Sequence, residues 1–168
     1  VGAAPADNVA LLLEVVRRAR AHGPVVLVGH SRGGMTVTGV ANAVPELLHR
    51  VVYVSAWCCV DLTAGGYMQE PEWASSVLND LGAGLLAGDP AALGVLRMNW
   101  RTADPDLLAD LKTAMLADGT DAEFLAALNT LEPDESLDGG SDRVDPDAWA
   151  GLPHTYVRLS GDRSVPVE

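Results

Sequence analysis

A short apolar run followed at once by a glycine-rich turn constrains the fold more than any other feature of this sequence. Val25–Val28 is rich in β-branched residues and shows no polar alternation, which is typical of a parallel strand buried on both faces. The turn Gly29–Gly34 closes it, and a helical pattern runs from about Gly33 to Ala43. A second apolar run, Val51–Ala56, predicts another strand. Strand, helix and strand with a crossover of this length form a βαβ unit, so we expect a parallel sheet.

The rest of the chain divides around this unit. An apolar stripe at helical spacing predicts a helix from about Ala6 to Ala21, and Thr155–Ser160 predicts a third strand. Strand signals are lacking between these regions, where short helices take over. We therefore expect an α/β protein in which residues 1–60 and 151–168 form the core and residues 61–150 form a mostly helical cap insertion.

Start signals mark the helices of the insertion. Each of three Asp-Pro pairs places an N-cap carboxylate before a proline at the first helical position: Asp89-Pro90, Asp104-Pro105 and Asp145-Pro146. Thr120 and Glu123 have the spacing of a capping box. The segment 132–147 is rich in Asp, Gly and Ser, and we interpret it as a loop.

The turn after the first strand has the spacing of a nucleophile elbow. Gly29, Ser31 and Gly33 form a G-x-S-x-G motif between a strand and a helix, the context in which a strained turn exposes a serine hydroxyl group. The backbone N–H of Arg32 would then point at a developing oxyanion. The alternative is an ordinary glycine-rich turn, which does not explain a serine at its tip. The phosphate-binding patterns G-x-G-x-x-G and G-x-x-x-x-G-K-[ST] are missing from the sequence.

A serine nucleophile needs a base, and the base needs an orienting carboxylate. Asp162 follows the third strand, at the edge of the sheet where Ser31 is expected. An ordinary turn aspartate explains its position equally well from spacing alone. Asp61, which follows the second strand, is the competing candidate for the acid.

Three segments resemble one family. Residues 25–56 (VVLVGHSRGGMTVTGVANAVPELLHRVVYVSA), 131–135 (LEPDE) and 153–163 (PHTYVRLSGDR) are similar to α/β-hydrolases, specifically the branch of small esterases and plant methylesterase and hydroxynitrile-lyase-like enzymes. The resemblance implies a partial α/β-hydrolase fold, with a parallel sheet flanked by helices and an inserted helical cap. It assigns Ser31 as the nucleophile, the backbone N–H of Arg32 as an oxyanion donor and Asp162 as the acid.

The sequence departs from this family in lacking a histidine that could act as the general base. The family's catalytic histidine follows its acid after one more strand, whereas six residues follow Asp162 here (168 − 162 = 6). Two histidines flank helix ends and a third precedes its strand at the wrong edge of the sheet (His22, His49 and His154). His30 adjoins Ser31 and is expected to line the pocket. We therefore expect a fragment that lacks the family's first strands and its histidine, and that is inactive by itself.

Other side chains have weaker assignments. Besides His30, Trp57 and Trp100 are candidates for the substrate pocket. The aromatic residues of the insertion, Trp100 among them, pack the cap in the alternative interpretation. Cys58 and Cys59 are expected to be free thiols, and no His/Cys spacing indicates a metal site.

The charge narrows the choice of partners. With 11 Lys and Arg against 23 Asp and Glu, the net charge is 11 − 23 = −12, which argues against nucleic acid and anionic membranes. No apolar stretch is long enough for a membrane span, and no leader precedes one, so we expect a cytoplasmic protein. We expect a small-molecule ester substrate and no cofactor, and the oligomeric state stays open.

Two functions from different classes fit the sequence. The first is a serine hydrolase that acts on carboxylic esters through an acyl-enzyme and needs the missing histidine; lyase and perhydrolase chemistry use the same triad. The second is a non-catalytic or incomplete α/β-hydrolase-like module that acts by binding or association. Neither the motif nor the fold identifies the substrate.

Overall fold

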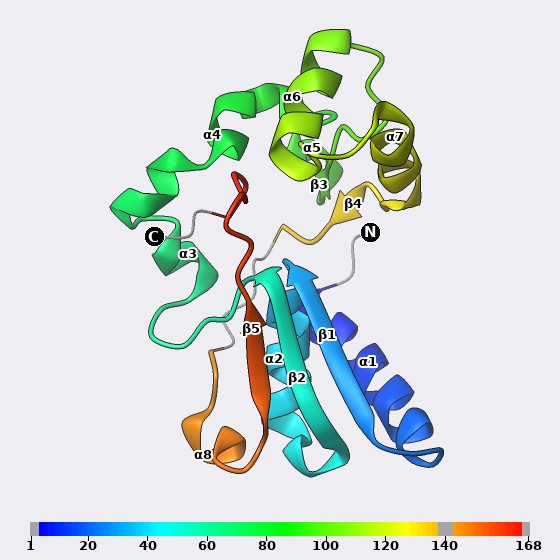
Figure 1. Cartoon of the computed structure of the whole chain (residues 1–168), viewed down its shortest axis with the longest axis vertical. Helices are drawn as coiled ribbons and strands as arrows, with labels where there is room; N and C mark the ends of the chain where they lie inside the picture. Colours follow the sequence, from blue (N-terminus) through cyan, green and yellow to red (C-terminus); the bar gives the residue numbers. More distant parts are fainter. Residues whose placement is uncertain (1–3, 138–142, 166–168) are drawn as a thin grey trace.

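Three parallel strands form the central sheet of the computed structural model, which describes residues 4–137 and 143–165 (Figure 1). They lie in the order β1 (Val25–Ser31), β2 (Leu48–Ala56) and β5 (His154–Val157). The chain crosses from β1 to β2 through α2 (Gly33–Ala43) and the 3₁₀ turn η1 (Pro45–Leu47). This confirms the parallel sheet. It also puts the carboxyl ends of all three strands at one edge, below the cap.

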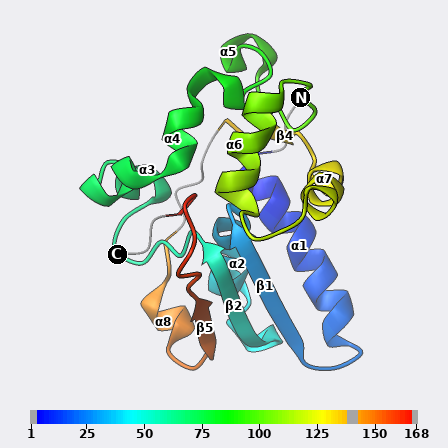
Figure 2. The same ribbon diagram turned by 45° about the horizontal axis from the view of Figure 1, so that its top comes forward.

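Helices cover one face of this sheet. They are α1 (Pro5–Arg20), α2 and α8 (Pro146–Trp149), and both views show them on the same side (Figures 1 and 2). The apolar stripe of α1 buries Val16 completely, and Val40 of α2 and Val51 of β2 are equally inaccessible. The helical spacing of the sequence therefore predicts correctly which side of α1 faces the core, where Val9, Leu12 and Leu13 also pack.

The opposite face of the sheet is open, which corrects one expectation from the sequence. In β1, Val25 and Leu27 are each 8% exposed, whereas Val26 and Val28 on the other face are 47% and 61% exposed. Since α1, α2 and α8 all lie on one side, the described residues supply no second layer. The prediction of strands buried on both faces was wrong for this part of the chain. Both strands lie at the predicted runs, but β1 continues to Ser31 and β2 begins earlier, at Leu48.

The third strand ends earlier than the sequence predicts. Its apolar pattern extends to Ser160, but β5 ends at Val157. The ladder between β2 and β5 closes with the pair Val54 and Val157, and the next residue of β2, Ser55, has a φ of +40°. A left-handed residue turns the backbone out of the pleat, so β2 offers β5 no further partner there.

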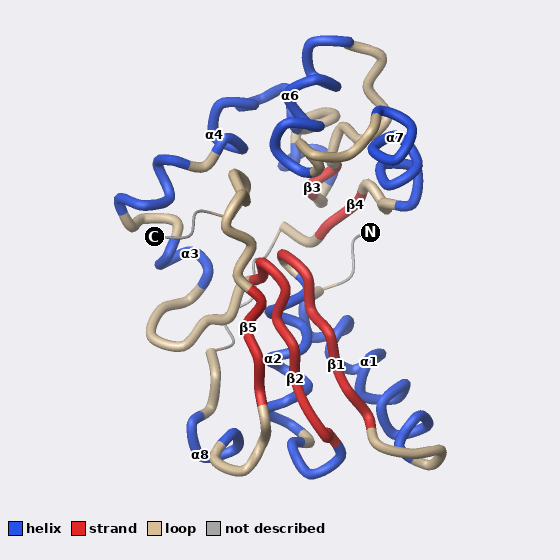
Figure 3. The backbone as a smooth tube through the Cα atoms, viewed as in Figure 1, coloured by secondary structure: helices blue, strands red, loops and turns tan. Residues whose placement is uncertain are grey.

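The cap is mostly helical and stands beyond the carboxyl ends of the strands (Figure 3). Its helical elements are α3 (Ala64–Tyr67), η2 (Pro71–Ser75), α4 (Val77–Leu81), η3 (Gly82–Leu85), α5 (Pro90–Leu93), α6 (Pro105–Met115) and α7 (Asp121–Thr130). The predicted start signals are confirmed, because Asp89, Asp104 and Thr120 accept hydrogen bonds from the first turns of their helices in the cap, and Asp145 does so for α8. The helix α8 packs on the core sheet and not in the cap, where the sequence placed it. Leu111, Phe124 and Leu128 form a second core between α6 and α7.

The cap also contains a small sheet that the sequence did not predict. β3 (Leu96–Arg97) pairs antiparallel with β4 (Asp134–Glu135), and Leu86 bridges to Met98. Strands of two residues are too short to show a period, and α6 and α7 lie between them in the chain. Part of the segment expected to be a loop, residues 138–142, lies outside the described residues. Among those described, no helix has both the length and the apolar character needed to cross a membrane.

Candidate active site

Ser31 lies on the turn between β1 and α2 in a strained conformation. It is the last residue of β1, and its φ of +50° falls in the left-handed region that costs a non-glycine residue about 1–2 kcal/mol. The backbone N–H of Trp57 donates to its carbonyl oxygen over 3.0 Å, which ties the turn to the end of β2. The side chain is half-buried, and its hydroxyl group has no hydrogen-bond partner among the described residues. This serine is therefore held in place by its backbone while its hydroxyl group stays available.

Two glycines make the turn possible, but only one of them is a predicted member of the motif. A Cβ atom on Gly29 would lie 2.8 Å from Cγ2 of Val37, and one on Gly34 would lie 2.4 Å from the carbonyl oxygen of Trp57. A Cβ atom on Gly33 would meet nothing within 4 Å. The G-x-S-x-G motif contains Gly29 and Gly33. In the structure, the two glycines that leave no room for a Cβ atom are Gly29 and Gly34, because the first turn of α2 lies against the backbone that follows β2.

Arg32 stands at the N-cap of α2. Backbone N–H groups at this end of a helix have no intrahelical partners and favour negative charge. Its side chain turns to the cap, where it forms an ion pair with Glu135 and donates to the carbonyl oxygen of Ser136. The turn that carries Ser31 is thereby joined to the small sheet of the cap.

Asp162 lies at the same edge of the sheet and both of its carboxylate oxygens accept hydrogen bonds. Oδ1 accepts from the backbone N–H groups of Ser164 and Val165, at 2.7 and 3.0 Å. Oδ2 accepts from the hydroxyl group of Ser55, which is 1% exposed at the end of β2. Sequence reasoning missed Ser55, since a serine that closes an apolar strand carries no motif.

Ser31 ends β1 and Asp162 comes after β5, the two outer strands of the sheet, with β2 between them. No histidine is hydrogen-bonded to either of them in the described part of the chain. His154 begins β5 at the opposite edge, where its ring contacts Trp149 and its Nδ1 lies 3.0 Å from the carbonyl oxygen of Leu152. The other three histidines are exposed (His22, His30 and His49). Ser31 and Asp162 thus lie at the carboxyl edge of the sheet, and no histidine of the described residues is hydrogen-bonded to either side chain.

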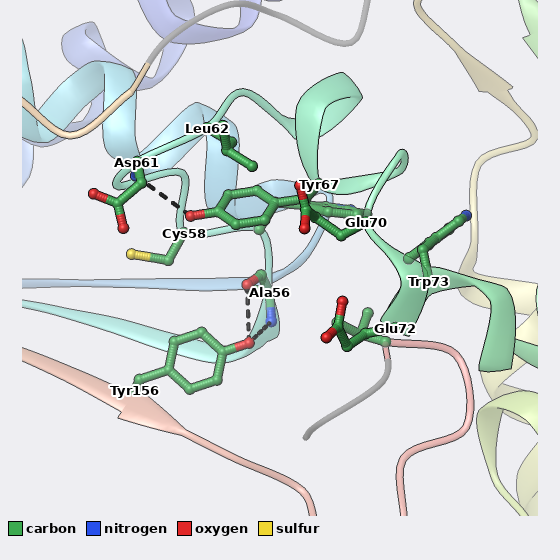
Figure 4. Close-up of a pocket in the computed structure, with 11 residues that line it drawn as sticks. Ala56, Cys58, Asp61, Leu62, Tyr67, Glu70, Glu72, Trp73 and Tyr156 are labelled. Atoms are coloured by element: carbon green, nitrogen blue, oxygen red, sulfur yellow. Dashed lines mark hydrogen bonds between the residues drawn. The ribbon is translucent and has the colours of Figure 1, made fainter.

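A pocket of about 580 Å³ opens beside the end of β2 (Figure 4). Trp57 and Trp73 form part of its wall, with ring centroids 5.1 Å apart, and Tyr67 and Tyr156 also line it. Three acidic residues complete the wall: Asp61, Glu70 and Glu72. The cavity is thus aromatic on its sides and acidic at several points of its lining.

The three residues predicted for a substrate pocket lie in different places. Trp57 lines the cavity just described. His30 lies on the open face of the sheet, where it pairs in register with Val54, and Trp100 packs against the α6–α7 core of the cap. Asp61, the competing acid, is exposed, and its backbone N–H donates to the hydroxyl group of Tyr67.

The neighbouring thiols are free, as the sequence predicts. Burial raises the pKa of Cys58, and it raises the pKa of Cys59 to about 11. Both side chains are therefore protonated thiols near neutral pH, the unreactive form of cysteine. The described residues contain no group of three or more His, Cys, Asp or Glu side chains arranged to hold a metal ion.

Similarity to known proteins is found at the level of family and fold. A family model described as "Alpha/beta hydrolase family" matches residues 2–168, whereas no curated protein matches the sequence. The pyrethroid hydrolase PytH, solved with BIF, is 18% identical with a TM-score of 0.67, and the match covers 94% of this chain and 59% of that one. An extracellular α/β-hydrolase from a Paenibacillus species, described as sharing structural and functional homology with Tobacco Salicylic Acid Binding Protein 2, is 16% identical with a TM-score of 0.64, covering 95% and 60%.

Polyneuridine aldehyde esterase is 18% identical with a TM-score of 0.55, and the match covers 92% of this chain and 62% of the esterase. The chain therefore spans between 59% and 62% of the length of these three proteins. At such identities the likeness shows the fold.

Proposed function

Because the chain belongs to the α/β-hydrolase family, we propose that it carries the nucleophile and the acid of a serine hydrolase that cleaves carboxylic esters. The observation that carries the proposal is the conformation of Ser31. Ser31 is a strained, left-handed serine at a strand-to-helix turn, and its hydroxyl group is available at the edge where parallel sheets place their sites. Strain of this kind is retained where function requires it.

In this mechanism Ser31 attacks the ester carbonyl carbon and forms an acyl-enzyme, which water then hydrolyses. The backbone N–H of Arg32, at the N-cap of α2, stabilises the tetrahedral oxyanion. Asp162 orients the imidazole of a histidine and stabilises the imidazolium that forms when it accepts the proton of Ser31. The hydrogen bonds from Ser55, Ser164 and Val165 support this role, because they hold the carboxylate in one orientation.

The base comes from outside these 168 residues. None of the four histidines is hydrogen-bonded to Ser31 or Asp162, and His154 lies at the other edge of the sheet. We therefore propose that a histidine from a further segment of the protein enters between Ser31 and Asp162. Without it, hydrolysis is expected to fall by several orders of magnitude, on the order of 10⁴-fold or more.

Esters are the proposed substrates because the structural neighbours include a pyrethroid hydrolase and polyneuridine aldehyde esterase. The cavity beside β2 is lined by Trp57, Trp73 and Tyr67 but by neither Ser31 nor Asp162, and we propose that it receives an apolar acyl or alcohol group of the ester. Since one fold hosts many reactions, the assignment rests on Ser31 and its surroundings.

Covalent labelling with a fluorophosphonate tests the nucleophile. The intact protein that contains this chain is expected to be labelled at Ser31 and to hydrolyse p-nitrophenyl butyrate, and Ser31→Ala is expected to abolish both. Ser75→Ala is the matched control, because Ser75 is an exposed serine of the cap. Unchanged labelling in Ser31→Ala would refute the role of this serine.

The competing function is a non-catalytic module that binds through its open surface. Val26 and Val28 on the open face of the sheet are 47% and 61% exposed, an apolar surface on which another segment or partner can pack. An intact protein with neither labelling nor esterase activity would favour this function over hydrolysis.

A further inference from the structure

The side chain of Arg32 joins two parts of the chain that are distant in sequence. Its Nε lies 3.2 Å from Oε2 of Glu135, and its Nη2 donates to the carbonyl oxygen of Ser136 over 2.8 Å. Both partners belong to the end of β4 and the residue after it. One planar guanidinium group therefore grips a carboxylate and a backbone carbonyl group at once.

The segment that Arg32 holds is itself well fixed within the cap. Arg97 of β3 makes two hydrogen bonds to the carboxylate of Asp134, at 2.6 and 2.7 Å. The backbone N–H of Met98 donates to the carbonyl oxygen of Pro133 over 2.7 Å. These hydrogen bonds join β3 to β4, and the contact of β4 with Arg32 connects the small sheet to the strand-to-helix turn.

We propose that the Arg32 side chain is a positioning residue that locks the cap sheet onto the turn carrying Ser31, so that the oxyanion donor is aligned only when the cap is docked. The inference rests on the proposed function and adds a role for a side chain that this function does not use. The backbone N–H of Arg32 is the proposed donor, and Arg32 immediately follows the strained Ser31. A shift of the Arg32 side chain is therefore expected to move both its own backbone N–H and the neighbouring Ser31.

The effect is expected in catalysis more than in stability. The side chains of Arg32 and Glu135 are 31% and 35% exposed, and ion pairs this open to water add little to the free energy of unfolding. Small displacements of a donor or nucleophile, in contrast, reduce rates strongly. Lysine keeps the positive charge, but its single ammonium group does not reproduce the simultaneous contacts of the planar guanidinium group with Glu135 and Ser136.

The contact of Arg32 with the cap is tested by the kinetics of three variants of the intact protein: Arg32→Met, Arg32→Lys and Glu135→Gln. For p-nitrophenyl butyrate we expect kcat to fall about tenfold in Arg32→Met, with a similar loss in the rate of fluorophosphonate labelling. In Glu135→Gln, which keeps the contact to Ser136, kcat is expected to fall less than in Arg32→Met. In Arg32→Lys, kcat is expected to lie between that of Arg32→Met and that of the wild type. The matched control is Arg97→Met, which removes an exposed ion pair of the same small sheet but does not touch the turn.

Hydrogen exchange of the same variants gives a readout that needs no activity. Arg32→Met is expected to speed amide exchange at Glu135–Leu137 and at Met35, whose N–H is bonded to the carbonyl oxygen of Arg32, and Arg97→Met only within the small sheet. Unchanged kcat, labelling and exchange at Met35 in Arg32→Met would overturn the lock. So would an equal loss of kcat in Arg97→Met, because general loosening of the cap would then be the cause. An inert wild-type protein whose exchange responds as expected would refute the proposed hydrolase and the catalytic part of the lock while retaining the mechanical coupling.

Discussion

The hydroxyl group of Ser55 donates a hydrogen bond to Oδ2 of Asp162, and it thereby ties the end of β2 to the turn that follows β5. Ser55 is inaccessible to solvent and has a φ of +40°. On the adjacent strand, Ser31 has a φ of +50° at the end of β1 and pairs with Ala56, the residue after Ser55. Two adjacent parallel strands thus carry left-handed serines near their carboxyl ends, one with an available hydroxyl group and one that holds the acid.

Removal of the Ser55 hydroxyl group is expected to destabilise the fold. Ser55→Ala leaves one carboxylate oxygen of Asp162 without its donor, and a hydrogen bond to a charged group contributes about 1.5–3 kcal/mol. Ser55→Gly also relieves the left-handed strain, so its cost should be lower by about 1 kcal/mol. Urea unfolding of both variants measures the difference. A Ser55→Ala variant as stable as the wild type would contradict the anchoring role.

The two glycines of the first turn of α2 should respond oppositely to alanine. In Gly34→Ala the new methyl group meets the carbonyl oxygen of Trp57 at 2.4 Å, so the backbone must shift, at a cost of at least 1–3 kcal/mol. In Gly33→Ala it meets nothing within 4 Å, and alanine favours the helix by about 0.5–1 kcal/mol. Thermal unfolding of the pair is the test. Equal midpoints would show that the turn does not pack as described.

The cap should depend on Leu111. This side chain is 0% exposed in α6 and packs with Phe124 and Leu128, so Leu111→Ala is expected to cost about 2–5 kcal/mol. Leu125→Ala is the matched control, because Leu125 in α7 is 46% exposed. Hydrogen exchange within α6 and α7 measures the local loss. Equal effects of the two variants would rule out the second core.

The thiol of Cys59 should be slow to react until the pH is high. Burial and the neighbouring Cys58 raise its pKa from 9.0 to about 11, so its thiolate fraction at pH 8 is about a hundredfold below that of an ordinary thiol. The folded state favours the protonated thiol. Its contribution to stability is therefore complete below pH 9 and declines as the pH rises from 9 towards 11.

Disulfide-exchange labelling of Cys58→Ser isolates Cys59 for this measurement. Burial, the main cause of the raised pKa of Cys59, remains in this variant, so the labelling rate is expected to keep rising about tenfold per pH unit beyond pH 9, and to reach that of an ordinary thiol in denaturant. A plateau near pH 9 in the folded protein would contradict the raised pKa.

Local signals in the sequence predicted the elements of the core well. The β-branched runs at Val25 and Val51 and the glycine-rich turn between them predicted β1, α2 and β2, and α2 has the predicted bounds. Asp-Pro pairs predicted helix starts at Asp89 and Asp104 because an N-cap needs only neighbouring residues. These features depend on contacts within a few residues.

Features that depend on distant contacts were missed or mistaken. The pairing of β3 with β4 brings Arg97 to Asp134 although α6 and α7 lie between them in the chain, and the two residues of either strand carry no pattern that predicts the pairing. The open face beside Val28 depends on where the helices pack, which the apolar character of a strand does not specify.

By itself the sequence determined the strand-to-helix turn at Ser31 and the α/β arrangement around it, because both follow from local backbone preference and from hydrophobic periodicity. Only the tertiary structure decided that Ser55 anchors Asp162, that Gly34 and not Gly33 accommodates the chain after β2, and that Arg32 reaches the cap. Each of these contacts joins residues far apart in the chain. Their distances are set by the register of β1, β2 and β5 and by the packing of the cap, which no local pattern encodes.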